Sequence, residues 1–236
     1  VTAQFKTKKD SSDLFKEISG DVHILAWTTT PWTLPSNTAL CVGPKIDYVA
    51  VQSYNAYTGE PITVVLAKAL LNTHFNPKAA EIALEDYKPG DKLVPFKVVA
   101  EYKGTDLVGM EYEQLIPWVN PGEGAFRVIP GDYVTTEDGT GIVHIAPTFG
   151  ADDALVAKNA GVPPLQLINK KGELRPMVDL TGKFYTLDEL DEDFIKQRVN
   201  VDLYKEYAGR FVKNAYDPNL SDQDESLDVS ICMMMK

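Results

Sequence analysis

Short apolar runs, rich in β-branched residues, recur along the first two-thirds of the chain and are separated by glycine, proline and asparagine. This pattern is typical of β-strands joined by tight turns. It predicts strands over 22–29, 38–42, 48–52, 62–67, 92–102, 126–129 and 141–146. Because no internal repeat is present, these short strands favour a β-barrel or a strongly curved sheet decorated by helices.

Helical patterns are predicted mainly after residue 150, with one short helix before it at 67–72. The run ADDALVAKNAG has acids in its first turn, apolar residues on one side and Gly161 as a stop. Thr186 to Glu189 matches a capping box, and apolar residues at helical spacing follow it. We therefore expect one domain with a β-rich core over about 20–150, a helical part over about 150–215 and a helical C-terminal third.

Composition narrows the class of protein. The 236 residues are 44% hydrophobic and hold no apolar run long enough to span a bilayer, which predicts a globular chain without a membrane segment. Cys41 and Cys232 lie far apart in apolar runs, so buried thiols in a reducing, cytoplasmic compartment are expected. The three histidines lack ligand spacing, so no metal is expected. The chain begins at Val1, and we expect it to be a domain excised from a larger protein.

The net charge of −11 argues against broad binding to a phosphate backbone, which relies on clustered Lys and Arg. Contact with a single nucleotide end remains compatible with this charge. The formal charge therefore excludes one mode of nucleic-acid binding but does not decide the function.

The stretch AWTTTPWTLP (residues 26–35) concentrates four threonines between two tryptophans and two prolines. Threonine is a common strand residue, so these hydroxyls have an ordinary structural interpretation. Pro31, however, ends the strand near Thr30, which leaves the last threonines at a strand end and in a stiff loop. Such places frequently carry sites, because a rigid sheet positions groups that the loop leaves accessible.

The stretch DGTGIVHIAPTFGADD (residues 138–153) predicts a strand followed by a loop and a helix start. Alternation places His144 on the opposite face from Val143 and Ile145. Asp152 and Asp153 begin the helix, where acids are favourable in any case. Taken alone, His144 is compatible with a core residue, and both aspartates with simple helix stabilisation.

Together, WTTTPWTLPSN and GTGIVHIAPTFGADD resemble the editing (CP1) domain of isoleucyl-tRNA synthetases, a similarity that extends over most of the chain. The PTFGADD run is more similar to eukaryotic cytosolic forms. The resemblance implies a β-barrel-centred α+β fold with peripheral helices, as in the valyl, isoleucyl and leucyl editing domains. The HIGH-type and KMSKS-type signatures of an activating domain are absent, so no aminoacylation by this chain is expected.

The resemblance also implies roles for individual residues. Asp153 matches the aspartate that pairs with the α-ammonium group of the substrate, whereas Asp152 is expected to stabilise the helix start. Thr29 and Thr30 would hold the terminal adenosine and position water, and His144 would limit the size of the side-chain pocket. Further substrate contacts are expected from Thr28, Thr33 and Asn37. Trp27 and Trp32 are assigned to packing.

The expected activity is hydrolysis of valine from mischarged tRNA for isoleucine, with valyl-adenylate as a second substrate. No nucleophile–base pair is visible, so direct attack by a positioned water is preferred to a covalent intermediate. The alternative is a non-catalytic module that binds the tRNA acceptor end. The expected partners are the 3′ end of the charged tRNA and the rest of the synthetase, with the chain itself a monomer. No cofactor is expected here, since ATP and Mg would serve the absent activating domain.

Overall fold

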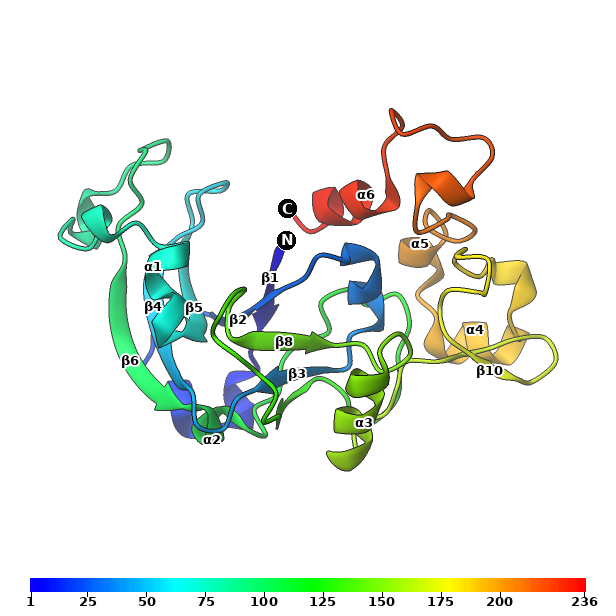
Figure 1. Ribbon diagram of the computed structural model, residues 1–236, viewed down its shortest axis with the longest axis horizontal. Helices are drawn as coiled ribbons and strands as arrows, with labels where there is room; N and C mark the ends of the chain where they lie inside the picture. The colour runs from blue at the N-terminus through cyan, green and yellow to red at the C-terminus, as the bar shows by residue number, and fades with distance from the viewer.

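An eight-stranded mixed sheet forms the body of the protein in a computed structural model that describes all 236 residues (Figure 1). The strand order is β6-β4-β5-β2-β8-β3-β7, with β1 also paired to β2. The strands are β1 (Thr2–Lys6), β2 (Val22–Trp27), β3 (Ala39–Val42), β4 (Asp47–Tyr54), β5 (Pro61–Ala67), β6 (Lys97–Lys103), β7 (Arg127–Pro130) and β8 (Ile142–Ile145). A separate pair joins β9 (Leu167–Ile168) to β10 (Leu174–Arg175).

All seven strands expected from the apolar pattern are present, with shifted ends. The largest shift is in β6, which begins at Lys97 because Pro95 has no N–H to donate to a ladder. The sequence pattern missed β1, whose residues TAQFK are too polar to stand out. This strand pairs antiparallel with β2 along its whole length, so the β-rich core starts at Thr2 rather than near residue 20.

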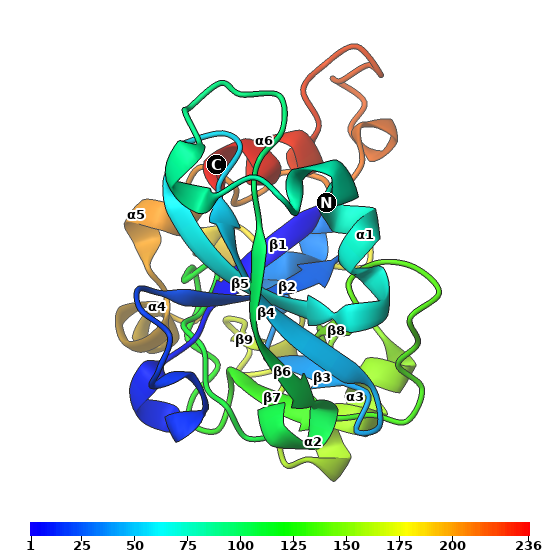
Figure 2. The ribbon, with the colours of Figure 1, turned by 90° about the vertical axis from the view of Figure 1, so that its left-hand side faces the viewer.

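The sheet is a half-barrel rather than a closed barrel, because the two outer strands β6 and β7 are not paired to each other. Of the two architectures expected from the sequence, the curved sheet decorated by helices is therefore the one present. Viewed from the β6 side, no further strand lies outside this edge (Figure 2). Lys97, Glu101 and Lys103 on β6 give the edge charged groups that discourage pairing with another chain. At the other edge, no further strand pairs with β7; the 109–112 segment meets it through a bridge between Glu111 and Arg127 and a few backbone hydrogen bonds, such as that from the Val128 N–H to the Met110 carbonyl. The sheet is therefore open and mixed, decorated by helices.

Both faces of the central strands are buried, so their side chains alternate between two apolar layers. On β4, Tyr48 and Ala50 face the main core, whereas Val49 and Val51 pack beneath the 75–96 segment. On β3, Leu40 faces the main core and Cys41 packs toward Ala157 of the helix α3 (Ala151–Asn159). Burial on both faces holds the ends of β2 and β8 firmly, and the candidate site lies at those ends.

The expected helix after Gly150 is present as α3, but the helical C-terminal third is wrong, since this region consists mostly of loops and short helices. A helix of a few residues rarely stabilises itself, so these turns depend on packing around Trp118, Phe184 and Tyr204. The α-helices are α1 (Leu71–His74), α2 (Gly104–Leu107), α3 (Ala151–Asn159), α4 (Glu192–Arg198), α5 (Val201–Tyr204) and α6 (Leu227–Met234). The 3₁₀ helices are Lys9–Ser11, Asp13–Phe15, Pro31–Ser36, Lys68–Leu70, Pro77–Ala79, Leu84–Asp86, Leu187–Glu189 and Asn214–Tyr216.

The last helix, α6, returns to the sheet and lies near the N-terminus, as Figure 1 shows in red. Leu227 and Ile231 are buried in the main core, which anchors α6 beside the 3₁₀ helix η3 (Pro31–Ser36). The sequence did not reveal this element. None of the helices is long and apolar enough to cross a membrane.

Candidate functional site

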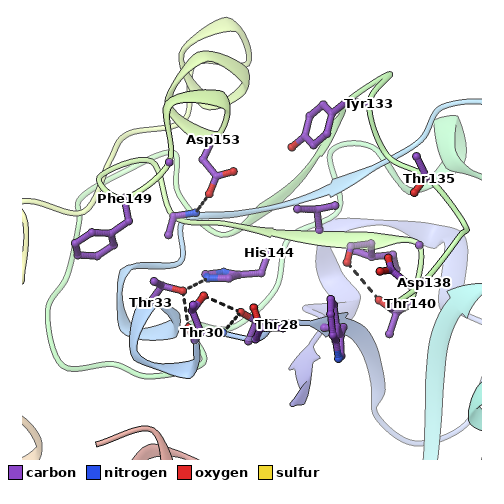
Figure 3. Close-up of a pocket in the computed structure, with 18 residues that line it drawn as sticks. Thr28, Thr30, Thr33, Tyr133, Thr135, Asp138, Thr140, His144, Phe149 and Asp153 are labelled. Atoms are coloured by element: carbon purple, nitrogen blue, oxygen red, sulfur yellow. Dashed lines mark hydrogen bonds between the residues drawn. The ribbon is translucent and has the colours of Figure 1, made fainter. Parts of the chain in front are cut away.

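The threonine loop connects β2 to η3 and forms one wall of a cavity of about 390 Å³ (Figure 3). Thr28 is buried, whereas Thr29 and Thr30 are exposed to the cavity. The Oγ1 atom of Thr28 accepts a hydrogen bond from the Thr30 N–H at 3.0 Å and lies 3.2 Å from the Thr30 Oγ1. Because only one proton lies between the two hydroxyls, the other hydroxyl proton is free to donate to a ligand or a water.

His144 projects from β8 toward Thr33 of the same wall, and both of its ring nitrogens have protein partners (Figure 3). The Asn37 Nδ2 lies 2.8 Å from the carbonyl oxygen of Ala39, which only accepts, so this atom is the amide NH₂ group. The same NH₂ lies 2.8 Å from His144 Nδ1, which must therefore be the unprotonated nitrogen. On the other side, the Asn37 Oδ1 accepts from the Tyr112 hydroxyl at 2.6 Å.

The second ring nitrogen of His144 is consequently the protonated one. The Thr33 Oγ1 donates its own proton to the Thr30 carbonyl at 2.8 Å, so it accepts from His144 Nε2 at 3.0 Å. Burial lowers the pKa of His144 to about 4. A neutral imidazole with both nitrogens occupied has no lone pair left for a substrate or a water. His144 therefore lines the cavity as a fixed wall rather than as a general base.

Asp153 reaches the same cavity from the first turn of α3 (Figure 3). Its Oδ2 accepts from the Ala146 N–H at 2.9 Å, and its Oδ1 has no partner within the chain. Burial raises the pKa of Asp153, Asp152 adds to this rise, and the Ala146 hydrogen bond opposes it. A Cβ at Gly150 would lie only 3.0 Å from the Asp153 Cγ, so glycine leaves room for this carboxylate.

A glycine turn closes the far side of the cavity. Gly139 and Gly141 adopt positive φ angles of 66° and 71°, and a Cβ at Gly141 would lie 2.4 Å from the Ala67 Cβ. Between them, the Thr140 Oγ1 donates to the Leu25 carbonyl of β2 at 2.7 Å. The turn is thus hydrogen-bonded to the same strand that carries the threonine loop.

The candidate residues taken from the sequence fall into two groups. Six of them line the one cavity, namely Thr28, Thr29, Thr30, Thr33, His144 and Asp153. Asn37 does not line it but stands behind His144 and orients its ring. Asp152 is exposed and faces away from this cavity, toward a neighbouring hollow. The two neighbouring aspartates therefore face different hollows, and only Asp153 lies where it could contact a ligand in this cavity.

Of the two tryptophans assigned to packing, one is packed against an aromatic ring and the other lines the cavity. Trp32 packs against Phe149 with ring centroids 4.9 Å apart, as expected. The assignment of Trp27 to packing is wrong, because its side chain is 41% exposed and lines the cavity beside Gly139. Sequence reasoning also missed further lining residues that only the fold brings together; these are Tyr133, Thr135, Asp138, Thr140 and Phe149.

The charged side chains that line the cavity are all acidic. Its lining includes two carboxylates, Asp138 and Asp153, and no Lys or Arg. It also includes no Ser or Cys that could form a nucleophile–base pair with His144. No group of three or more His, Cys, Asp or Glu side chains gathers where it could hold a metal ion. The arrangement suits a small ligand with a cationic group and an adjacent region rich in hydroxyl donors.

Comparison with known proteins gives strong matches in sequence. The whole chain is 88% identical to 20% of the isoleucine–tRNA ligase of Bacteroides fragilis and 70% identical to 22% of that of Bacteroides thetaiotaomicron. The enzyme of Cytophaga hutchinsonii is 50% identical over 97% of the chain and 18% of its own length. No protein-family model matches the chain.

These relatives place the chain among the aminoacyl-tRNA synthetases, as a fragment that spans about a fifth of their length. Within that class it belongs with the isoleucine–tRNA ligases, which confirms the expected relationship. The eukaryotic cytosolic type is not supported, since these relatives are bacterial. The run PTFGADD therefore does not distinguish the eukaryotic forms.

Solved structures are similar to the chain only in part. One is GlLeuRS-CP1, with a TM-score of 0.47 and 19% identity over 68% of this chain and 62% of that one. Another is the editing domain of the cytosolic leucyl-tRNA synthetase of P. knowlesi, with a TM-score of 0.49 and 14% identity over 67% and 61%. At these scores the similarity carries no argument about activity.

Proposed function

We propose that the cavity is a hydrolytic editing site that removes valine from mischarged tRNA for isoleucine, with valyl-adenylate as an alternative substrate. The observation that carries this proposal is the unpartnered Oδ1 of Asp153 in a cavity whose lining has no cationic side chain. An aminoacyl ester brings a free α-ammonium group, which supplies the missing positive charge. Pairing with that group would anchor the ester against the threonine loop.

The hydrolysis needs little more than orientation, because an aminoacyl ester is already activated. The free hydroxyl proton of the Thr28–Thr30 pair and the exposed Thr29 hydroxyl offer contacts to the terminal ribose or to the attacking water. Their positions are held by β2 on one side and η3 on the other. Positioning of this kind lowers a barrier by removing the entropy cost of bringing the reactants together.

His144 supports the selectivity part of the proposal. A pocket that selects isoleucine gains only about 1–3 kcal/mol over valine from one methylene, a limit known for isoleucyl enzymes themselves and not taken from this structure. A second pocket that rejects isoleucine by size would remove this error. The imidazole of His144, held by Asn37 and Thr33, is a wall rigid enough to reject one additional methylene.

The proposal also covers the partners, compartment, cofactors and oligomeric state of the chain. The partners are the 3′ end of the charged tRNA and the remainder of the synthetase, and the compartment is the cytoplasm. ATP and Mg would act in the activating domain, while this site works by water, hydroxyls and Asp153 alone. We propose that the chain forms no oligomer of its own.

Asp153→Ala and Asp152→Ala in the intact synthetase test the assignment. We expect Asp153→Ala to reduce deacylation of valyl-tRNA by at least about a hundredfold, since a charge-assisted contact is lost. Asp152→Ala is the matched control, because it removes an acid from the same turn but outside the cavity. Equal losses in the two folded variants would contradict the role of Asp153.

The second candidate function is a non-catalytic module that binds the acceptor end. The same cavity favours it to the extent that hydroxyls and a carboxylate can hold an aminoacyl end without cleaving it. That module would protect valyl-tRNA from spontaneous hydrolysis. An editing site would instead accelerate hydrolysis, so the sign of the change in rate separates the two functions.

A further inference from the structure

The first turn of the 3₁₀ helix η3 receives no side-chain hydrogen bond from its own N-cap residue. A helix start has unpaired N–H groups, which the side chain of the N-cap residue usually accepts. Thr30 is the N-cap residue of η3, but its side chain makes no cap hydrogen bond. Its hydroxyl instead lies 3.2 Å from the Thr28 hydroxyl and lines the cavity.

The missing acceptor comes from the opposite end of the chain. The Oδ1 of Asp228 in α6 accepts from the Trp32 N–H at 2.8 Å, across 196 residues of sequence. Asp228 is held in place because its neighbour Leu227 and the following turn at Ile231 are buried in the main core. In addition, the Ser226 hydroxyl caps α6 by accepting from the Val229 N–H.

We propose that Asp228 is a positioning residue for the hydrolysis proposed above: its carboxylate caps η3 from α6 and thereby leaves the Thr30 hydroxyl free for the cavity. The inference rests on the proposed function of that cavity. Without the carboxylate, the Thr30 hydroxyl, as the N-cap side chain, is the group whose position suits it to accept from the N–H groups of its own helix. It would then turn away from Thr28 and from the substrate.

The test uses three single variants of the intact synthetase. We expect Asp228→Ala to lower kcat for deacylation of valyl-tRNA about tenfold with KM nearly unchanged, because orientation is lost and binding is not. Asp228→Asn keeps an acceptor oxygen and is expected to retain kcat within about threefold. Ser226→Ala weakens the start of α6 without touching η3, so it controls for loosening of the helix and is expected to deacylate normally.

A double variant that combines Asp228→Ala with Thr30→Val tests whether Asp228 acts through the Thr30 hydroxyl. If Asp228 acts through the Thr30 hydroxyl, then adding Asp228→Ala to Thr30→Val lowers kcat no further. Additive losses, or equal losses in Asp228→Ala and Asp228→Asn, would overturn the proposal. So would full activity of Asp228→Ala.

Hydrogen exchange gives a readout that does not depend on catalysis. The amide of Trp32 should exchange faster in Asp228→Ala than in Ser226→Ala, since it loses its acceptor. An unchanged exchange rate at Trp32 would overturn the capping role. If the unmutated synthetase fails to deacylate valyl-tRNA while the Trp32 amide responds as expected, the proposed function fails and the capping contact stands.

Discussion

The neutral state of His144 has a measurable effect on stability. In the unfolded chain this histidine titrates near the ordinary value of 6.5, whereas in the fold burial lowers its pKa to about 4. Protonation of the folded form would also place a proton on Nδ1 against the NH₂ group of Asn37. The folded state therefore binds fewer protons than the unfolded state between these two pH values.

The sign and size of the effect follow from this difference. The stability that His144 contributes is complete above about pH 6.5 and is lost as pH falls toward about 4. At about 1.4 kcal/mol per pH unit, the interval from 6.5 to about 4 corresponds to about 3 kcal/mol. We expect the free energy of unfolding of the protein to fall by this amount relative to that of His144→Gln, which cannot titrate.

The assay is urea unfolding of both proteins at a series of pH values from about 7 down to about 4. His23→Gln is a second comparison, because burial also lowers the pKa of His23, so removing this residue should change the pH profile in the same direction. Carboxylates with raised pKa values, such as Asp153 and Asp228, are present in every variant and cancel in the comparison. Parallel pH profiles for the protein and His144→Gln would refute a neutral His144 ring with hydrogen bonds at both nitrogens.

Two further perturbations test the walls of the cavity. His144→Ala should open space for one more methylene, so that the variant deacylates isoleucyl-tRNA while still deacylating valyl-tRNA; loss of both activities with a lower melting temperature would instead indicate a core histidine. Gly141→Ala should lower the free energy of unfolding by about 2–4 kcal/mol in urea, because a positive φ and a 2.4 Å contact with Ala67 combine. Gly172→Ala, with a positive φ but nothing within 4 Å, should lose only about 1 kcal/mol, and equal losses would contradict the packing argument.

The local features of the site were predictable from the sequence because each follows from a short pattern. Alternation along β8 placed His144 opposite Val143 and Ile145, and the acids after Gly150 marked the start of α3. Pro31 marked the end of the strand before the threonine loop, although β2 itself ends at Trp27. These patterns depend on neighbours within a few residues, so they can be recognised without the fold.

The remaining features depend on contacts between distant segments. Tyr112, Asn37 and His144 form one network although 107 residues separate the last two, and no periodicity links them. Trp27 was assigned to packing, yet the residue that faces it from a distant part of the chain is Gly139, which has no side chain to cover it. The open edge of the sheet likewise depends on how β6 and β7 pair, which the strand pattern alone does not determine.

The most direct measurement compares the rates at which the intact synthetase deacylates valyl-tRNA and isoleucyl-tRNA, both made on tRNA for isoleucine. The geometry of Asp153, the threonine loop and His144 predicts that valyl-tRNA is hydrolysed well above its spontaneous rate. Isoleucyl-tRNA should be hydrolysed at least about tenfold more slowly, because one methylene must be forced against a fixed wall. Equal rates for the two esters, or no acceleration of valyl-tRNA hydrolysis, would contradict a size-excluding hydrolytic site.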